Sequence, residues 1–337
     1  MTTIKRIGFA VTTSLAAFLA HPLVLAAQPG QGRGRQGAGF LEVLSRPKFV
    51  TMLVIGLIAL VLLLTRRMKN TIKVPILLLS TFLYGIAANL PIKLFAGFSM
   101  HPSPICAATK SILYGFRMPM MVTLGVILFL TLVGPKLFCG WVCPVGAVQE
   151  LIAMLADKLR IRRRKLSFRF TQGVRVSIFL LFVFLSGTAV LHVVQQNGAR
   201  VALSLYDHIN AFHGFELGAQ PTLLDGIFHF LPFVLTLVLA FFFYRPFCYL
   251  VCPIGLLTNL VEQFGLFRVV MKKPTCNDCG ACAIKAPCPT VPEILKDAAF
   301  RPDCFSCNVC VSGCCPKGSL KFGIDCKKNG VGPQQLK

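Results

Sequence analysis

The sequence has little charge, and very little of it is negative. Only 14% of the 337 residues are charged, and 12 Asp and Glu stand against 35 Lys and Arg, which gives a formal net charge of +23. Hydrophobic residues make up 55% of the chain, and its mean hydropathy is +0.70. Soluble globular proteins average about 25% charged residues. This composition therefore excludes an ordinary soluble protein.

Sequence signatures of substrate chemistry are also missing. The chain has no P-loop, no dinucleotide-binding glycine fingerprint and no convincing Ser-His-Asp set. It has no recognisable nucleic-acid-binding motif either, and the basic residues instead gather at the ends of apolar runs. That placement is typical of a membrane protein and does not indicate a nucleic-acid partner.

Long apolar runs predict an all-α, polytopic membrane domain over residues 48–270. Residues 28–47, rich in Gln, Gly and Arg at their start, are expected to form a linker before it. Residues 1–27 have a basic start, an apolar core and a small-residue site, so they form either a signal peptide or a sixth, uncleaved span. Five further runs approach the roughly 20 residues that cross a bilayer: 49–65, 74–92, 118–137, 174–194 and 227–244.

The distribution of basic residues predicts the orientation of these spans. The loop after the third span carries seven Lys and Arg, including four in succession from Arg162 to Lys165. The 195–226 loop has Arg200 as its only Lys or Arg. Because cytoplasmic loops are enriched in Lys and Arg, the sequence predicts a cytoplasmic (inner) membrane protein in contact with lipid. Its basic loops and C-terminal tail are expected in the cytoplasm, and the 195–226 loop outside.

Cysteine runs dominate the tail. The first reads C-x2-C-x2-C-x5-C-P, and the second reads C-x2-C-x2-C-x3-C-C-P. Three thiolates at this spacing can hold one [4Fe-4S] cluster, and in two-cluster ferredoxins each run supplies the fourth ligand of the other cluster. We therefore expect two [4Fe-4S] clusters in a small α+β ferredoxin-like domain over residues 271–326, followed by a tail at 327–337.

The cross-run rule predicts two ligand sets. One set combines Cys304, Cys307 and Cys310 with Cys288. The other is Cys276, Cys279, Cys282 and either Cys314, at the usual spacing, or Cys315, which precedes a proline as Cys288 does. A zinc site more often has paired C-x2-C units, and disulfides need an oxidising compartment, so both alternatives are disfavoured.

A second cysteine pattern occurs twice, and we call the two copies box 1 and box 2. Box 1 is F-C-G-W-V-C-P-V-G at 138–146, and box 2 is F-C-Y-L-V-C-P-I-G at 247–255. Six of the nine positions are identical, at a constant offset of 109 residues. Each box follows a span and leads into an apolar-periodic stretch that we expect to form an interfacial amphipathic helix. The sequence thus predicts a duplicated unit.

The boxes present four thiols at the cytoplasmic ends of two spans: Cys139, Cys143, Cys248 and Cys252. They can ligate a third cluster, bind another metal, or cycle as dithiols. The alternative is that they are small buried residues that pack the two repeats together.

The duplicated C-x3-C-P boxes followed by a two-run ferredoxin tail resemble the membrane polyferredoxins over roughly residues 50–322. That family includes the membrane quinol-dehydrogenase subunit of the periplasmic nitrate reductase system and the C-terminal half of the nitrous-oxide reductase regulator. The resemblance implies electron transfer between a quinone pool or a cytosolic donor and a periplasmic or membrane redox partner protein. A different hypothesis is a copper reduction or assembly factor for a respiratory oxidase, because soft thiolates favour Cu(I).

Overall fold

The computed structural model describes residues 40–87, 95–100, 103–114, 118–191, 206, 209–215, 223–271, 276, 279–296, 303–314 and 318–324. The predicted signal peptide or first span at 1–27, the tail at 327–337 and Cys315 lie outside the described residues. The end of the predicted linker is described, and it contains the short helix α3 (Phe40–Leu44).

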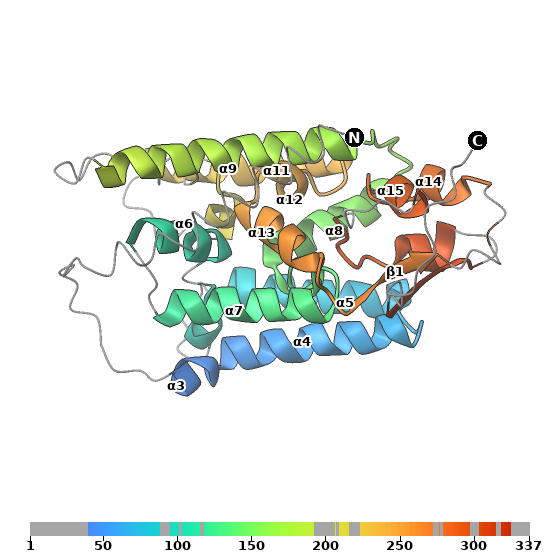
Figure 1. The fold of residues 1–337 in the computed structure, drawn as a ribbon, viewed down its shortest axis with the longest axis horizontal. Helices are drawn as coiled ribbons and strands as arrows, with labels where there is room; N and C mark the ends of the chain where they lie inside the picture. The colour runs from blue at the N-terminus through green and yellow to red at the C-terminus, as the bar shows by residue number, and fades with distance from the viewer. Residues whose placement is uncertain are drawn as a thin grey trace.

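Five long helices run side by side along the long axis of the molecule (Figure 1). They are α4 (Pro47–Leu64), α5 (Asn70–Thr81), α7 (Met118–Val133), α9 (Phe168–Leu191) and α11 (Leu223–Phe242). The prediction of a mainly helical fold is thus confirmed. Helix α5 continues into a π-helical turn at Phe82–Ile86.

Two stretches in the described part of the chain, Pro47–Leu64 and Phe168–Leu185, are long and apolar enough to cross a bilayer by themselves. Three shorter apolar helices accompany them, Asn70–Ile86, Met118–Val133 and Phe230–Phe242. Length and composition thus identify two of the five predicted spans. All five helices expose large apolar side chains on the outside of the bundle, for example Val61, Leu78, Phe129, Phe184 and Leu235.

Further helices pack inside the bundle. Helix α8 (Pro144–Lys158) packs on α5 and α11, whereas α13 (Pro253–Glu262) packs on α6 (Pro104–Tyr114), α7 and α9. These are the stretches that were expected to lie at the membrane interface. Their helical character is confirmed, but eight of the ten residues of α13 are buried. That helix therefore belongs to the core of the bundle. The described residues also include 3-10 turns at Ala96–Phe98 and Ala211–Phe215, a π-helical turn at Phe138–Val142 and the short helix α12 (Pro246–Leu250).

The cysteine-rich tail forms an α+β unit at one end of the bundle, on the right in Figure 1. Strand β1 (Phe267–Met271) pairs antiparallel with β2 (Leu320–Ile324), with Val269 opposite Phe322. The helices α14 (Ala281–Lys285) and α15 (Val291–Leu295) and a π-helical turn at Cys310–Cys314 lie between the strands in sequence. The small sheet therefore begins at residue 267, four residues before the predicted domain boundary.

Candidate functional site

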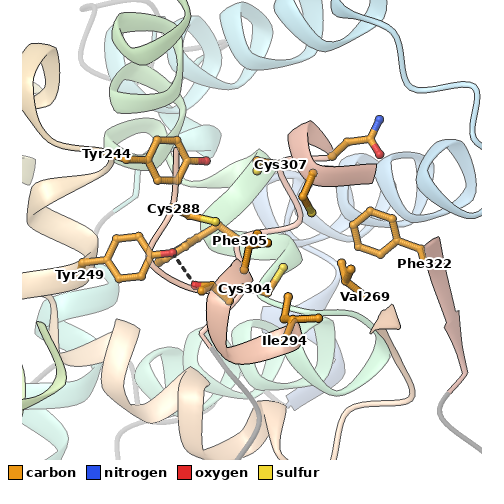
Figure 2. Close-up of a pocket in the computed structure, with 13 residues that line it drawn as sticks. Tyr244, Tyr249, Val269, Cys288, Ile294, Cys304, Phe305, Cys307 and Phe322 are labelled. Carbon is orange, nitrogen blue, oxygen red and sulfur yellow. Dashed lines mark hydrogen bonds between the residues drawn. The ribbon is translucent and has the colours of Figure 1, made fainter. Parts of the chain in front are cut away.

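The second cysteine run of the tail lines a small cavity, together with one cysteine of the first run. The four cysteines are Cys288, Cys304, Cys307 and Cys310. Figure 2 places three of them, Cys288, Cys304 and Cys307, around the space between Tyr249 and Phe322. The structure thus gathers the four residues that the cross-run rule assigns to one cluster.

The donors around this cavity fit an iron–sulfur cluster. Burial raises the pKa of the Cys288 thiol to about 12, and burial likewise raises that of Cys304 well above its usual value. A thiolate here therefore needs a compensating cation, which iron supplies. Backbone N–H groups of Thr290 and Val291 are directed at Cys288. Such N–H···S contacts stabilise cluster thiolates and tune their potential.

The other predicted ligand set is only partly described. Cys276 is half-buried, Cys279 is exposed and Cys282 is buried. Helix α14, which carries Cys282, packs against the turn that ends at Cys314, so the backbone brings the first run next to the end of the second. The Cys314 side chain and the whole of Cys315 lie outside what the structure describes.

The two boxes share their backbone geometry at the second cysteine, although box 1 forms a π-helical turn at Phe138–Val142 and box 2 begins in helix α12 (Pro246–Leu250). In each box the N–H of the second cysteine donates to the carbonyl of the residue five positions earlier: Cys143 to Phe138 at 2.9 Å, and Cys252 to Phe247 at 3.0 Å. Both cysteines are extended, with φ −63° and ψ 121° in box 1 and φ −65° and ψ 118° in box 2. A proline follows each at the first helical position, where its fixed φ starts a helix and its missing N–H costs nothing.

The repeats are interlocked, because the helix that follows each box bonds to the other box. Gln149 of α8 donates its Nε2 to the Sγ of Cys248 at 3.4 Å, and Thr258 of α13 makes a side-chain hydrogen bond with Cys139. Residues 149 and 258 are separated by the same 109 positions as the boxes. The first cysteine of each box thus lies at a contact between the two repeats.

Each repeat also has a basic side chain that donates hydrogen bonds to the box of the other repeat. Lys136 and Arg245 each lie three residues before the first cysteine of a box, and both have left-handed backbone, with φ 45° and 48°. Lys136 donates to the carbonyl of Gly255 in box 2 at 2.8 Å. Arg245 donates to the carbonyl of Cys139 in box 1 at 2.9 Å. These charges favour electron-rich thiolates at the boxes.

The four box thiols are near enough to affect one another electrostatically. Burial raises the pKa of Cys139 and of Cys252 to about 12. Burial and the neighbouring cysteines Cys248, Cys139 and Cys252 raise the pKa of Cys143 well above its usual value. Among the described residues, no three His, Cys, Asp or Glu side chains are grouped for a single metal ion. A cluster spreads its thiolates over separate irons, so it accepts wider spacing.

Two buried carboxylates, which sequence reasoning missed, connect the boxes to the tail. Glu150 of α8 accepts hydrogen bonds from Lys73, from Tyr244 at 2.6 Å and from Arg245 at 2.9 Å. Burial acts to raise the pKa of Glu150, but the charges of Lys73 and Arg245 prevail and hold it at about 2. Lys73 also donates to the carbonyl of Cys307 at 3.1 Å.

The second carboxylate, Asp303, directly precedes Cys304, a predicted cluster ligand of the tail. It pairs with Lys136 and with Arg175, whose Nη2 lies 2.6 Å from its Oδ2. One sequence signal could have indicated both carboxylates. Acidic residues are rare in the chain, yet Glu150 lies in an apolar stretch and Asp303 in a cysteine-rich one.

Comparison with known proteins finds iron–sulfur relatives for the segments that carry the boxes. A 4Fe-4S binding domain family matches residues 116–169 and 226–274, and each matched segment contains one box. The ferredoxin-type protein NapH of Haemophilus influenzae is 29% identical over 203 residues, which are 57% of this chain and 64% of NapH. The methylamine utilization ferredoxin-type protein MauN of Methylorubrum extorquens is 31% identical over 158 residues, 47% of this chain and 49% of MauN.

The regulatory protein NosR of Stutzerimonas stutzeri is 29% identical over 152 residues, 44% of this chain and 20% of NosR. The chain therefore spans less than two thirds of each of these three relatives. No solved structure matches it. The paired boxes and these likenesses indicate similarity to 4Fe-4S proteins of the polyferredoxin type. The chain is similar to the ferredoxin-type protein NapH and to part of NosR.

Proposed function

We propose that this protein transfers electrons through the cytoplasmic membrane, from a quinone pool or a cytosolic donor to a periplasmic or membrane redox partner protein. The observation that carries the proposal is the cavity lined by Cys288, Cys304, Cys307 and Cys310. These four residues hold one [4Fe-4S] cluster in our proposal. Cys276, Cys279 and Cys282 hold a second, with Cys315 or Cys314 as the fourth ligand. When bound, each cluster supplies a one-electron couple.

Five membrane spans are part of this proposal. The apolar side chains exposed on α4, α5, α7, α9 and α11 support it, because a face of this kind is stable against lipid and not against water. The basic loop after the third predicted span supports a cytoplasmic location for the tail. Lys165 of that loop donates to the carbonyl of Ala283 in the tail at 2.6 Å, so the loop and the tail lie at the same end of the bundle.

The boxes form one chemical site in our proposal, holding a third cluster or another metal. Support comes from the matching backbone at Cys143 and Cys252, the crossed contacts of Gln149 and Thr258, and the buried cations Lys136 and Arg245.

Single and double substitutions test whether the boxes act together. We expect Cys139→Ala and Cys248→Ala each to abolish quinol-dependent or donor-dependent electron transfer in membranes, and the double variant to be no worse, because residues that act as a unit are not additive. Cys106→Ala, at a buried cysteine of α6 outside the boxes, is the control. If both single box variants transfer electrons normally while they insert and fold, the box thiols are packing residues.

A further inference from the structure

Residues 303–308, which we call the ligand loop, are inserted between the helical bundle and the rest of the tail. The loop carries two cysteines of the cavity, Cys304 and Cys307, and its other four residues are all buried. Two of those, Ser306 and Asn308, have left-handed backbone, with φ 52° and 66°. Such strain persists where surrounding contacts hold the conformation.

Asp303 makes the strongest of these contacts. Its carboxylate pairs with Lys136 and Arg175, and all three side chains have 0% exposure. Gln172 of α9 donates a further hydrogen bond to Oδ2 at 3.2 Å. The two cations also bond to box 2, since Lys136 donates to the carbonyl of Gly255 and Arg175 to that of Cys248 at 3.1 Å.

Another residue of the ligand loop, Phe305, connects the loop to box 1. Its ring lies 4.8 Å from the Lys136 ammonium and 5.0 Å from the Arg245 guanidinium. Its carbonyl is so close to Gly140 that a Cβ at that glycine would overlap it. The loop thus contacts box 1 through Phe305 and box 2 through the cations that hold Asp303.

The geometry points to Asp303 as a positioning residue that fastens the tail's ligand loop to both boxes, so that the tail and box sites form one rigid unit. This inference rests on the proposed function of the tail as a cluster domain. It assigns Asp303 no chemical step: the carboxylate neither ligates iron nor carries electrons. Its role is to hold Cys304 and Cys307 at a fixed place against boxes 1 and 2.

The test uses the full chain, purified without oxygen in detergent, with three variants. Asp303→Asn removes the charge and keeps the shape, and Asp303→Glu restores the charge. Asp157→Asn is the matched control, because Asp157 pairs with Arg163 but its side chain is 62% exposed. Three quantities are measured in each: iron and sulfide per chain, hydrogen exchange of the backbone amides of residues 303–310, and the midpoint potential of the tail's EPR signal.

We expect the Asp303→Asn protein to retain its iron. Its loop amides should exchange at least about tenfold faster, because the two buried cations lose their counter-charge. The midpoint potential of the tail's EPR signal should rise. Asp303→Glu should recover most of both effects, and Asp157→Asn should match the wild type. Unchanged exchange and potential in iron-loaded Asp303→Asn would overturn the inference. Absence of iron from the wild-type protein would instead overturn the proposed function.

A milder variant keeps the test decisive if Asp303→Asn does not fold. Gln172→Leu removes only the neutral donor to Asp303. It should speed exchange of the same loop amides by a smaller factor and leave the iron content unchanged. If the Asn variant cannot be purified and loop exchange in Gln172→Leu equals that of the wild type, Asp303 is not fastening the loop.

Discussion

Glu150 is one of only 12 acidic residues in the chain, and the structure places it in the interior with three partners. Lys73 and Arg245 are buried beside it, and Tyr244 donates a hydrogen bond. A buried ion pair adds little net stability when it is complete, but removal of one partner leaves an uncompensated charge. The significance of Glu150 therefore lies in the cations that it neutralises next to box 1 and Cys307.

We predict that Glu150→Gln lowers the free energy of unfolding by about 3–5 kcal/mol, because Lys73 and Arg245 then stay buried without a counter-charge. The exposed pair Asp157–Arg163 provides the control. Asp157→Asn should cost about 1 kcal/mol or less. Unfolding midpoints in detergent measure both changes, and equal midpoints for the two variants would contradict this account of Glu150.

The pH dependence of stability follows from the same carboxylate. Its pKa falls from 4.5 to about 2 on folding, so the unfolded chain binds the proton more readily than the folded one. The stabilisation is complete above about pH 4.5 and is lost as the pH falls toward 2. We expect the difference in unfolding midpoint between wild type and Glu150→Gln to shrink over this interval and to be constant above it.

At the scale of elements, each repeat consists of a long helix, a cysteine box and a proline-initiated inner helix. The sequence repeat identifies Gln149 and Thr258 as equivalent positions. It does not reveal whether each residue contacts its own box or the other one. The structure shows both contacts: Gln149 bonds to Val145 of box 1 and Cys248 of box 2, and Thr258 bonds to Gly255 of box 2 and Cys139 of box 1. This arrangement makes the two repeats mutually dependent.

The close approach of box 1 to the ligand loop gives a prediction for one glycine. A methyl group at Gly140 would overlap the Phe305 carbonyl, a backbone atom that cannot rotate away. We expect Gly140→Ala to cost about 1–3 kcal/mol of stability and to make the tail more sensitive to limited proteolysis. Gly173→Ala on α9, where a Cβ meets nothing within 4 Å, should be neutral or slightly stabilising. Identical proteolysis of the two variants would show that the contact is not a tight one.

At the scale of the whole molecule, some features were predictable because they are encoded locally. The spacing of Cys304, Cys307 and Cys310 encodes a ligand arrangement, and the prolines after Cys143 and Cys252 encode helix starts. The insertion of the ligand loop was not predictable in this way. The contact between Lys136 and Asp303 joins residues 167 positions apart. The sequence has 35 Lys and Arg and 12 Asp and Glu, and no sequence pattern indicates which basic residue pairs with which acidic one.

The proposed orientation of the whole chain leads to a topology prediction. A cytoplasmic reporter fused after Lys337 should be active, and a periplasmic reporter at the same place inactive, because the basic loops follow the positive-inside rule. The reverse result would place the tail thiols in an oxidising compartment, where disulfides compete with cluster assembly. Fusion within the 195–226 loop should give the opposite pattern and serves as the internal control.

The central claim is that the tail cysteines hold iron–sulfur clusters, and quantification of iron and sulfide in the anaerobically purified full chain tests it most directly. Two [4Fe-4S] clusters in the tail require about eight irons and about eight sulfides per chain, and a box cluster would add to both numbers. We expect Cys288→Ala to lose about four of each, the content of one cluster, while Cys106→Ala loses none. Iron and sulfide near zero after anaerobic reconstitution, with zinc in their place, would contradict the account.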